Sequence, residues 1–245
     1  MKVVYVISSI ILIISTIIIL VMFNKQPSLD KRLANLDLTD IDKVMFVAHP
    51  DDETIWGGAH LLQDKYLVVC MTCGRNKIRD KEITKAMKYS HDELIMLGYP
   101  DKILGIRSHW RDEFKSVVQN VRTILNYKEW KVVVTHNPQG EYGHHQHQLT
   151  NKIITDIYGK RENLYYFGKY YRKSQLKITP KDSNLNKNVL RKKINQMLPI
   201  YKSQNFIDRK FGHMYPLEEW KKSTDKIWQQ KPLPPLTKPI KIAKI

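Results

Sequence analysis

The sequence predicts an α/β fold, a three-layer Rossmann-like domain with a mainly parallel sheet, preceded by one transmembrane helix. Short, solidly apolar runs alternate along the chain with segments whose apolar residues recur at helical spacing. This alternation is typical of βα units, in which helices cover both faces of a parallel sheet. Polar clusters directly follow two of the apolar runs, as expected where the strands of such a sheet end at a ligand site.

The N-terminal segment carries the transmembrane prediction. Val3–Phe23 is a run of 21 residues without a charged side chain. At about 1.5 Å per residue, a helix of this length spans the roughly 30 Å hydrocarbon core of a bilayer. A cleavable signal peptide, the alternative, would have a shorter apolar region followed by small residues, whereas this run ends in Val-Met-Phe-Asn. We therefore expect residues 1–24 to form an uncleaved, single-pass membrane anchor. The few basic residues near it leave open which side of the membrane holds the domain.

Five strands are expected after a polar linker over residues 25–42. Each is a short run of apolar, β-branched or aromatic side chains, such as "KVMFVA", "YLVVCMT" and "KVVVTH", and these residue types suit a half-buried or buried pleated surface. The continuous apolar character of these runs indicates strands that are covered on both faces. The expected strands are residues 43–48, 66–72, 102–106, 131–136 and 163–168.

Helices are expected between and after these strands. The segment from 81 to 98 has apolar residues at helical spacing and ends in Gly98, a residue type that commonly terminates a helix. Pro199 interrupts the last expected helix. The expected helices are residues 54–64, 81–98, 111–127, 147–158 and 190–204. One folded domain is thus expected over residues 43–230, followed by a Pro/Lys-rich tail over residues 231–245.

The charge of the chain is strongly positive, with a formal net charge of +17 from Lys and Arg scattered along it. Such a field attracts anionic lipid headgroups, acidic glycans and nucleic acid alike. Because no helix-turn-helix, zinc-finger or RNA-binding signature is present, nucleic acid is not an expected partner. An anionic surface as partner and a merely solvated, Lys-rich exterior both stay open.

Two polar clusters mark the candidate site. "AHPDDE" follows the first expected strand and holds His49, Asp51, Asp52 and Glu53, and "THNPQGEYGHHQH" follows the strand over 131–136 and holds four of the nine histidines. Neighbouring carboxylates repel one another at a strand end unless a positive charge offsets them. Since both clusters are expected at the same edge of the sheet, a divalent metal ion would supply that charge.

The ligand types favour a catalytic metal site. Structural zinc sites are built mainly from cysteine, and neither cluster contains one. His49 and Asp52 can face one point if Pro50 and Asp51 form the turn between them, and a histidine of the second cluster would complete three ligands. Asp51 is then left to act as a general base toward a water at the metal. Zn²⁺ is the expected cofactor, and Fe²⁺ or another divalent ion fits the same ligand types.

The two motifs together resemble the PIG-L/LmbE-like family of zinc-dependent N-acetylglucosaminyl deacetylases. The family pattern is His-Pro-Asp-Asp-Glu followed by Gly-His-x-x-His, and the second part reads "GHHQH" from Gly143 to His147 here. The likeness covers about residues 43–160. At the matching positions it implies that His49, Asp52 and His147 are the zinc ligands and that Asp51 is the general base.

The resemblance also implies roles for three further residues. His144 resembles a residue that donates a proton or stabilises developing charge, and Tyr142 matches a tyrosine that some members use near the oxyanion. Arg79 falls where some members contact substrate. Gln146 departs from the pattern, since many relatives have Asp there, and the change is expected to affect the orientation of the neighbouring histidine.

The expected function is hydrolysis of the acetamido group of an N-acetylglucosamine-type sugar, with release of acetate. The apolar N-terminus and the basic composition point to a glycolipid or cell-envelope amino-sugar glycan as substrate. Two alternatives remain. One is another mononuclear zinc hydrolase such as a phosphoesterase, and the other is a membrane-tethered, non-catalytic protein that binds glycans or anions.

Several polar or aromatic residues have a simpler structural interpretation. Glu53 is expected at a helix start, where the helix dipole stabilises a carboxylate, and His145 is expected to face solvent. The aromatic residues over 164–171 are expected to pack in a strand rather than stack on a sugar. For His136, a pocket-lining role and a hydrogen-bonded structural role both stay open.

Overall fold

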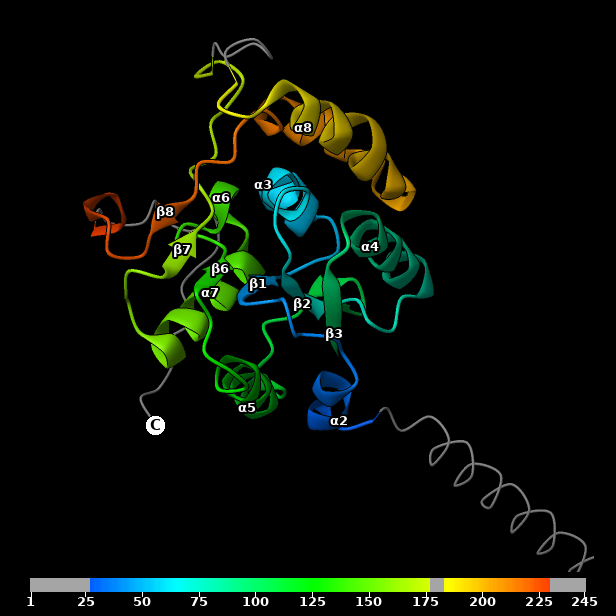
Figure 1. The fold of residues 1–245 in the computed structure, drawn as a ribbon, viewed down its shortest axis with the longest axis vertical. Helices are drawn as coiled ribbons and strands as arrows, with labels where there is room; N and C mark the ends of the chain where they lie inside the picture. The colour runs from blue at the N-terminus through cyan, green and yellow to red at the C-terminus, as the bar shows by residue number, and fades with distance from the viewer. Residues whose placement is uncertain (1–26, 177–182, 230–245) are drawn as a thin grey trace, which may run out of the picture. The chain divides into compact units, whose positions relative to one another are not determined.

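The computed structural model of the chain describes residues 27–176 and 183–229 (Figure 1). The chain divides into two compact units, Met1–Asn35 and Leu36–Ile245. All the described strands lie in the second unit, and so do both polar clusters.

The described part of the first unit is the short helix α2 (Leu29–Ala34), which lies within the expected linker. Its N-terminus is capped by Ser28, whose hydroxyl accepts the amide hydrogen bond of Lys31. The expected membrane anchor over residues 1–24 and the tail over residues 231–245 lie outside the described residues. Within residues 27–176 and 183–229, no helix is long and apolar enough to cross a membrane.

The second unit is built around a six-stranded sheet with the strand order β3-β2-β1-β6-β7-β8. The first five strands in this order run parallel, and β8 pairs antiparallel with β7 at one edge. The central strands β1 and β2 are almost wholly buried, as their solid apolar runs predicted. The strands are β1 (Lys43–Val47), β2 (Leu67–Thr72), β3 (Glu93–Tyr99), β6 (Val132–Thr135), β7 (Leu164–Tyr166) and β8 (Lys221–Lys222).

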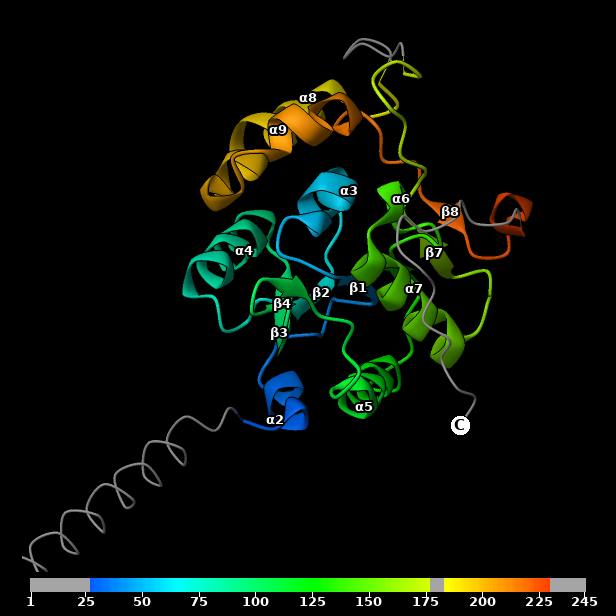
Figure 2. The same cartoon turned by 180° about the vertical axis from the view of Figure 1, so that it is seen from behind.

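Helices cover both faces of this sheet, which confirms the layered α/β architecture (Figures 1 and 2). The helices α3 (Asp52–Leu61) and α4 (Lys77–Ser90) lie on one face, and α5 (Phe114–Leu125) and α7 (His145–Tyr158) lie on the other. The chain moves outward from β1 to β3 and then returns to β6 on the other side of β1. The carboxyl ends of β1 and β6 therefore form the topological switch point, where open α/β sheets bind ligands.

The C-terminal part of the second unit lies over α3 and α4 (Figure 1). The helix expected over residues 190–204 is broken into shorter pieces, with Pro199 in a one-turn 3-10 helix, because proline cannot continue an α-helix from within. The pieces are α8 (Lys187–Lys192), a π-helical turn (Lys193–Met197), two 3-10 turns (Leu198–Ile200 and Lys202–Gln204) and α9 (Ile207–Phe211).

A buried ion pair joins this C-terminal part to α3. Lys193, at 0% exposure, donates to Glu218 Oε1 at 2.5 Å and to the carbonyl oxygen of Ile55 at 2.8 Å. Glu218 in turn accepts the amide N–H of Ala59 at 2.8 Å and lies 2.8 Å from Nδ1 of His60. The hydrogen-bonding capacity of both charges is thus used inside the protein, which is what a buried pair requires.

The prediction of one helix over residues 81–98 is wrong for the second half of this segment. The helix α4 ends at Ser90, His91 takes a left-handed conformation with φ of 65°, and the strand β3 follows from Glu93. A short apolar run such as "ELIMLGY" fits a buried strand as well as a helix. Gly98, expected as a helix cap, lies in β3, where its Cα approaches Gly74 so closely that a Cβ on Gly74 would stand 2.9 Å from it.

The strand expected over residues 102–106 is also different from the prediction. It is a separate two-stranded hairpin of β4 (Lys102–Ile103) and β5 (Ile106–Arg107) and takes no place in the main sheet. The positive φ of Leu104 and Gly105 turns the chain back on itself within two residues.

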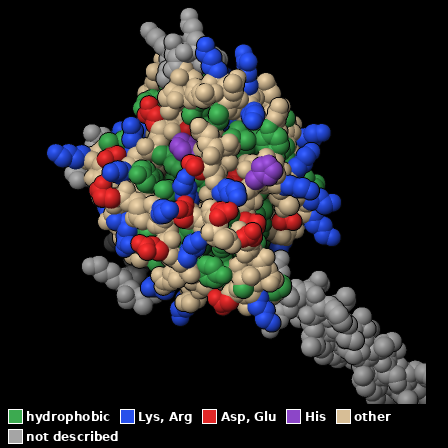
Figure 3. All heavy atoms as spheres, viewed as in Figure 1, with side chains coloured by type: hydrophobic (Ala, Val, Ile, Leu, Met, Phe, Trp, Pro, Cys, Tyr) green, Lys and Arg blue, Asp and Glu red, His purple; other side chains and the backbone are tan. Residues whose placement is uncertain are grey.

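On the face that Figure 3 shows, basic side chains are spread out rather than gathered in one patch. Figure 3 shows Lys and Arg distributed across the whole visible face and interspersed with Asp and Glu. This distribution leaves both interpretations of the net charge open.

Candidate metal centre and active site

A pocket lies at the carboxyl ends of β1 and β6. Segments far apart in the sequence border it: the loop after β1, the first turn of α4, the β4–β5 hairpin, the loop before α7, and α9. Six of the seven predicted site residues line it, and the seventh, His147, is fully buried with its ring centroid 4.3 Å from that of His144. The six lining residues are His49, Asp51, Asp52, Arg79, Tyr142 and His144.

The loop after β1 turns His49 and Asp52 toward each other. The carboxylate oxygen Oδ2 of Asp52 accepts the His49 amide N–H at 2.8 Å and lies 3.1 Å from His49 Nδ1. Asp51 adopts a φ of 126°, which is rare for a residue with a side chain. This turn lets the two neighbouring carboxylates point in different directions, Asp52 toward the histidines and Asp51 toward Arg79.

The loop after β6 folds back through three residues with positive φ. These are Gly140, Glu141 and Gly143, with φ of 64°, 55° and 90°, and they lie in the short helix α6 (Gly140–Gly143) just before α7. Two of them are glycines, which take such angles without strain. Asn137 holds the turn by accepting the amide N–H of Glu141 at 3.1 Å. The result is that the Glu141 carboxylate lies beside the histidine on the first turn of α7.

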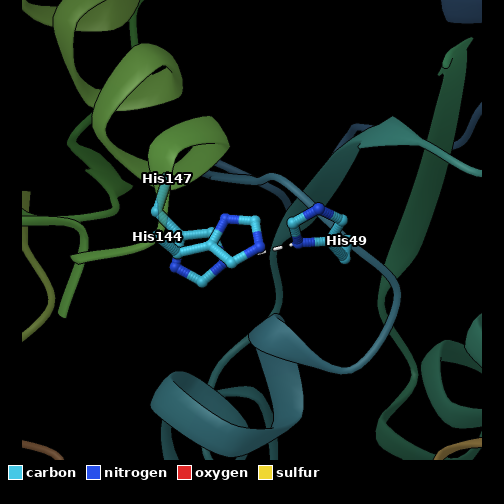
Figure 4. A group of neighbouring side chains, drawn as sticks. All are labelled: His49, His144 and His147. Carbon is cyan, nitrogen blue, oxygen red and sulfur yellow. Dashed lines mark hydrogen bonds between the residues drawn. The ribbon is translucent and has the colours of Figure 1, made fainter. Parts of the chain in front are cut away.

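Three of the predicted ligand atoms form a nearly equilateral triangle. His49 Nδ1 and Asp52 Oδ2 are 3.1 Å apart, and His147 Nε2 lies 3.3 Å from each of them. Figure 4 shows the rings of His49 and His147 meeting from β1 and α7. An ion with tetrahedral bonds of about 2.0–2.1 Å spaces its ligand atoms about 3.3 Å apart. The donor set and its spacing therefore fit one divalent ion, and two of the three residues, His49 and Asp52, line the pocket.

Both histidines of the triangle are held by a hydrogen bond on their second ring nitrogen. His147 Nδ1 lies 2.5 Å from Glu141 Oε2, and His49 Nε2 lies 2.8 Å from Gln146 Oε1. Each oxygen accepts a ring N–H and so leaves the lone pair of the other nitrogen facing the triangle, the usual arrangement around a metal-binding histidine. The Gln146 amide is itself anchored, because its Nε2 donates to three backbone carbonyls of residues 100–108.

His136 lies close to the triangle but is engaged elsewhere. Its Nε2 accepts the amide N–H of Ala48 at 2.9 Å, and its Nδ1 lies 2.9 Å from Glu141. The Nε2 lone pair is thus occupied by a backbone hydrogen bond, and the proton on Nδ1 points to the carboxylate. Two other groups of possible ligands lie among the described residues: His49, His144 and His147, and Asp52, His136 and His147. The group with His136 is less suitable for this reason, and His136 is a structural residue.

The electrostatics of the triangle call for a positive charge. Burial lowers the pKa of His49, but hydrogen bonds to Asp101 and Asp52 outweigh it and raise that pKa to about 10. Burial raises the pKa of Asp52, but the facing histidines hold it well below its usual range. A buried carboxylate that stays ionised needs a cation next to it, and a divalent ion within the triangle would serve in place of a proton.

Asp51 stands apart from the triangle as a separate carboxylate. Burial and the charge of Asp52 raise the pKa of Asp51 well above its usual value, and Arg79 offsets part of the rise. Arg79 Nη2 lies 3.3 Å from Asp51 Oδ2 and also donates to the carbonyl oxygen of Pro50. A carboxylate with a raised pKa is a better proton acceptor near neutral pH. Arg79 also lines the pocket. Its predicted contact with substrate stays a prediction.

His144 and Tyr142 complete the wall opposite Asp51. His144 Nδ1 is buried without a hydrogen-bond partner in the described part of the chain, and burial together with the nearby cationic groups lowers its pKa. Burial also raises the pKa of the Tyr142 phenol. Both side chains are therefore hydrogen-bond donors at neutral pH, the imidazole through its N–H and the phenol through its O–H.

Sequence reasoning missed the supporting residues. Glu141 was not singled out, although a carboxylate in a glycine-rich loop six residues before a candidate ligand is a usable signal. Glu53 lies in the first turn of α3 as expected, but it is fully buried and accepts the Asp51 amide N–H at 3.0 Å. His145 packs against His109 and takes no part in the triangle.

Comparison with known proteins agrees with this geometry. Residues 44–158 match the sequence profile of PIG-L, described as GlcNAc-PI de-N-acetylase. This segment of the chain is similar to the PIG-L family. The matched segment runs from β1 to the end of α7 and includes every atom of the triangle.

One curated relative and one solved structure extend the comparison. An uncharacterized protein of Acanthamoeba polyphaga mimivirus is 33% identical over 147 residues, which cover 53% of this chain and 62% of that protein. The crystal structure of GalB, the 4-carboxy-2-hydroxymuconate hydratase of Pseudomonas putida KT2440, superimposes with a TM-score of 0.51 at 14% identity, over 71% of this chain and 82% of that one. This second likeness shows a shared fold.

Proposed function

We propose that the protein is a zinc-dependent N-deacetylase that hydrolyses the acetamido group of an N-acetylglucosamine-type sugar and releases acetate. One observation carries the proposal: three ligand atoms lie at tetrahedral spacing, two of their residues line a pocket, and the wall of that pocket holds a separate buried carboxylate, Asp51. A metal site next to a free base is the equipment of a hydrolase that uses an activated water. The PIG-L match supports an acetamido sugar as the substrate class.

His49, Asp52 and His147 would hold the ion. When bound there, a divalent ion supplies Lewis-acid polarisation of the acetamide carbonyl and lowers the pKa of a water. Two imidazoles and one carboxylate at tetrahedral spacing favour zinc. Fe²⁺ accepts the same ligand types, so the identity of the ion belongs to the test.

Asp51 acts first as the general base and then as the general acid of the reaction. It takes one proton from the attacking water while the water oxygen bonds to the acetamide carbon. The same proton then passes to the sugar nitrogen as the C–N bond breaks, and acetate and a free amine are the products. Arg79, 3.3 Å from this carboxylate, fixes its orientation and keeps it ionised before the reaction.

His144 and Tyr142 act on the carbonyl oxygen. Negative charge develops on that oxygen when the carbonyl carbon becomes tetrahedral, and preorganised donors in a site that excludes water stabilise it strongly. The unpartnered Nδ1 of His144 is consistent with a nitrogen kept for a ligand. In this proposal, His144 is a donor to the oxyanion rather than the acid that protonates the leaving amine.

We also propose that the protein acts at a membrane. The uncharged Val3–Phe23 segment is long enough to anchor the chain as a single-pass protein. A lipid-linked or cell-envelope amino sugar is then the substrate that the anchored domain meets most often. The net charge of +17 favours anionic surfaces, and nucleic acid is not an expected partner.

Acetate release tests the proposal. The full chain, purified in detergent, is incubated with soluble and lipid-linked N-acetylglucosamine substrates and compared with its Asp51→Asn variant, and metal content is measured on both. We expect the variant to keep its metal and to lose about 10²–10⁴-fold in rate. Metal binding with hydrolysis of phosphoesters and no acetate would favour a phosphoesterase instead, and metal binding without hydrolysis of either class would favour a binding protein.

A further inference from the structure

Nearly all of the large apolar side chains that are exposed to solvent lie in segments around the pocket. Six large hydrophobic residues are exposed within residues 27–176 and 183–229, and five of them lie in segments that also line the pocket. We call these five the apolar rim: Ile78, Ile103, Leu104, Ile106 and Phe206. The sixth, Tyr127, lies between α5 and β6 at the opposite edge of the sheet. Exposed apolar residues that gather at one place indicate an interaction surface.

The tip of the β4–β5 hairpin is the extreme case. Leu104 is 97% exposed, and both Leu104 and Gly105 have positive φ, of 50° and 79°. A two-residue turn of this kind favours Asn, Asp or Gly at its first position. Leucine there bears a backbone strain and exposes its whole side chain to water. Nothing that Leu104 packs against within the described residues offsets these two costs, so a partner outside the chain is indicated.

The hairpin separates apolar from basic side chains. Ile103 pairs with Ile106 and Lys102 pairs with Arg107. Because successive residues of a strand point to opposite faces, the two isoleucines share one face and the two basic residues share the other. Lys102 and Arg107 line the pocket, so the base of the hairpin forms the pocket wall and its tip extends beyond it.

Basic side chains at the pocket mouth form no salt bridge among the described residues, although the Asp101 carboxylate is close enough to interact with Lys102 and Arg107. Lys102, Arg107 and Lys210 line the pocket, and none of the three takes part in any of the salt bridges found among the described residues. Lys210 instead lies 4.1 Å above the ring of Tyr142. Three cations without a salt bridge, next to an apolar rim, complement a bilayer surface, where anionic headgroups lie above a hydrocarbon interior.

We propose that the apolar rim docks the domain on an anionic lipid bilayer. Leu104 and its neighbours enter the boundary between headgroups and acyl chains, and Lys102, Arg107 and Lys210 face the lipid phosphates. The uncharged Val3–Phe23 segment of the same chain makes a bilayer the surface most available to this rim. Docking places the mouth of the pocket at the lipid surface, and it stands independently of the reaction proposed above.

Site-directed fluorescence tests the proposal without any substrate. A polarity-sensitive fluorophore is attached to Leu104→Cys in the full chain, reconstituted in vesicles of phosphatidylcholine and phosphatidylglycerol. The matched control carries the same fluorophore at Glu129→Cys, an exposed position between α5 and β6. Both are made in a Cys73→Ser background, because Cys73 is partly exposed whereas Cys70 is buried.

We expect the Leu104 probe to shift to shorter wavelength, to be quenched by spin-labelled lipids and to be about tenfold less accessible to aqueous iodide than the Glu129 probe. The protection should decrease when phosphatidylglycerol is omitted. Equal iodide access at both positions contradicts the proposal. A Leu104 probe that is protected from iodide but not quenched by spin-labelled lipids also contradicts it, because a second copy of the chain would then cover the rim.

A kinetic comparison adds a readout on the enzyme. The Leu104→Asp/Ile106→Asp variant changes two exposed residues outside the catalytic machinery, so its thermal stability should match that of the wild type. Burial of one such side chain favours membrane binding by about tenfold or more. We therefore expect kcat/KM to fall about tenfold on a membrane-held acetamido sugar and to be unchanged on a soluble one. If the protein proves not to be a deacetylase, the fluorescence measurement still decides the docking.

Discussion

Helix α3 joins two clusters of buried charge that differ in one respect. Near its C-terminal end, Lys193 and Glu218 form a closed pair, in which each charge is fully supplied with partners from the protein. At its first residue, Asp52 belongs to an open cluster with His49 and His147, whose lone pairs face one another across 3.1–3.3 Å. Both clusters are deeply buried.

The difference distinguishes a structural cluster from a ligand site. A closed pair needs nothing more, and its role is to hold the C-terminal part of the domain against α3. An open cluster brings a carboxylate and two imidazole nitrogens together, and it needs a cation, either a proton on His49 or a metal ion. Burial and charge alone do not distinguish the two clusters as candidate ligand sites. The direction of the lone pairs distinguishes them.

The largest expected effect comes from breaking the open cluster. Asp52→Ala removes its only carboxylate ligand, so metal content should fall and acetate release should drop by about a thousandfold or more. The metal-free variant should be less stable than the metal-free wild type, because the His49 amide N–H and the protonated His49 ring lose the carboxylate that they face. Metal analysis, acetate release and thermal unfolding check the three parts. Full metal occupancy in the variant would refute the ligand assignment.

Breaking the closed pair should affect stability and leave the chemistry intact. Lys193→Met leaves Glu218 buried and unpaired, and we expect the free energy of unfolding to fall by about 3–5 kcal/mol. Metal stoichiometry per folded molecule should not change. The matched control is the double variant Lys193→Met/Glu218→Gln, which restores a neutral interior and should recover most of the loss in urea unfolding. A double variant as unstable as the single one would mean that packing, not charge, is responsible.

A smaller effect is expected from the carboxylate behind the ligands. Glu141→Gln keeps an acceptor for His147 Nδ1 but loses the negative charge that strengthens that ligand, and metal affinity should weaken about 10–100-fold. Glu82→Gln is the matched control, because Glu82 is a buried carboxylate whose partner is Ser203 rather than a ligand. Competition with a fluorescent chelator measures both affinities. Equal affinities would remove Glu141 from the metal centre.

The smallest expected effect concerns the Asp92 carboxyl group, which belongs to neither cluster and has a hydrogen bond to only one of its two oxygens. Asp92 accepts the Tyr66 amide N–H at 2.7 Å, but its Oδ2 is buried without a hydrogen-bond partner among the described residues. Burial raises its pKa from 3.8 to about 7. A pKa raised in the folded state means that the folded form binds the proton more tightly, so this contribution to stability is present below pH 4 and is lost as the pH rises to about 7.

Asp92→Asn keeps the acceptor oxygen and removes the ionisation. Relative to the wild type, it should therefore gain up to about 2 kcal/mol between pH 5 and pH 8. Urea unfolding at the two pH values measures this difference. A stability difference that does not change with pH would show that Asp92 titrates normally.

The sequence predicted the parts of the fold that follow from local pattern. The strands β1, β2 and β6 are continuous apolar runs, and such runs become the buried centre of a parallel sheet wherever they occur. The strand β3 was missed because "ELIMLGY" fits two periods, and the left-handed conformation of His91 that separates it from α4 leaves no clear trace in the sequence. The π-helical turn that carries Lys193 could not be predicted either, since the ion pair with Glu218 joins residues 25 positions apart.

The sequence predicted those residues of the candidate site that belong to the two motifs. "AHPDDE" and "GHHQH" supply the proposed ligands and base directly, and the βα order places both motifs at one edge of the sheet. Glu141 and Gln146 could not be assigned to His147 and His49, because those contacts depend on the positive φ angles of the loop before α7. Tertiary geometry, rather than residue type, decides which polar neighbour orients which ligand.

Anomalous X-ray diffraction from crystals of the zinc-loaded full chain tests the central claim most directly. We predict a single peak at the zinc edge, bonded to His49 Nδ1, Asp52 Oδ2 and His147 Nε2, with its fourth position open to the pocket. A peak ligated by His136, or no peak between the three atoms in protein that hydrolyses its substrate, would contradict the account.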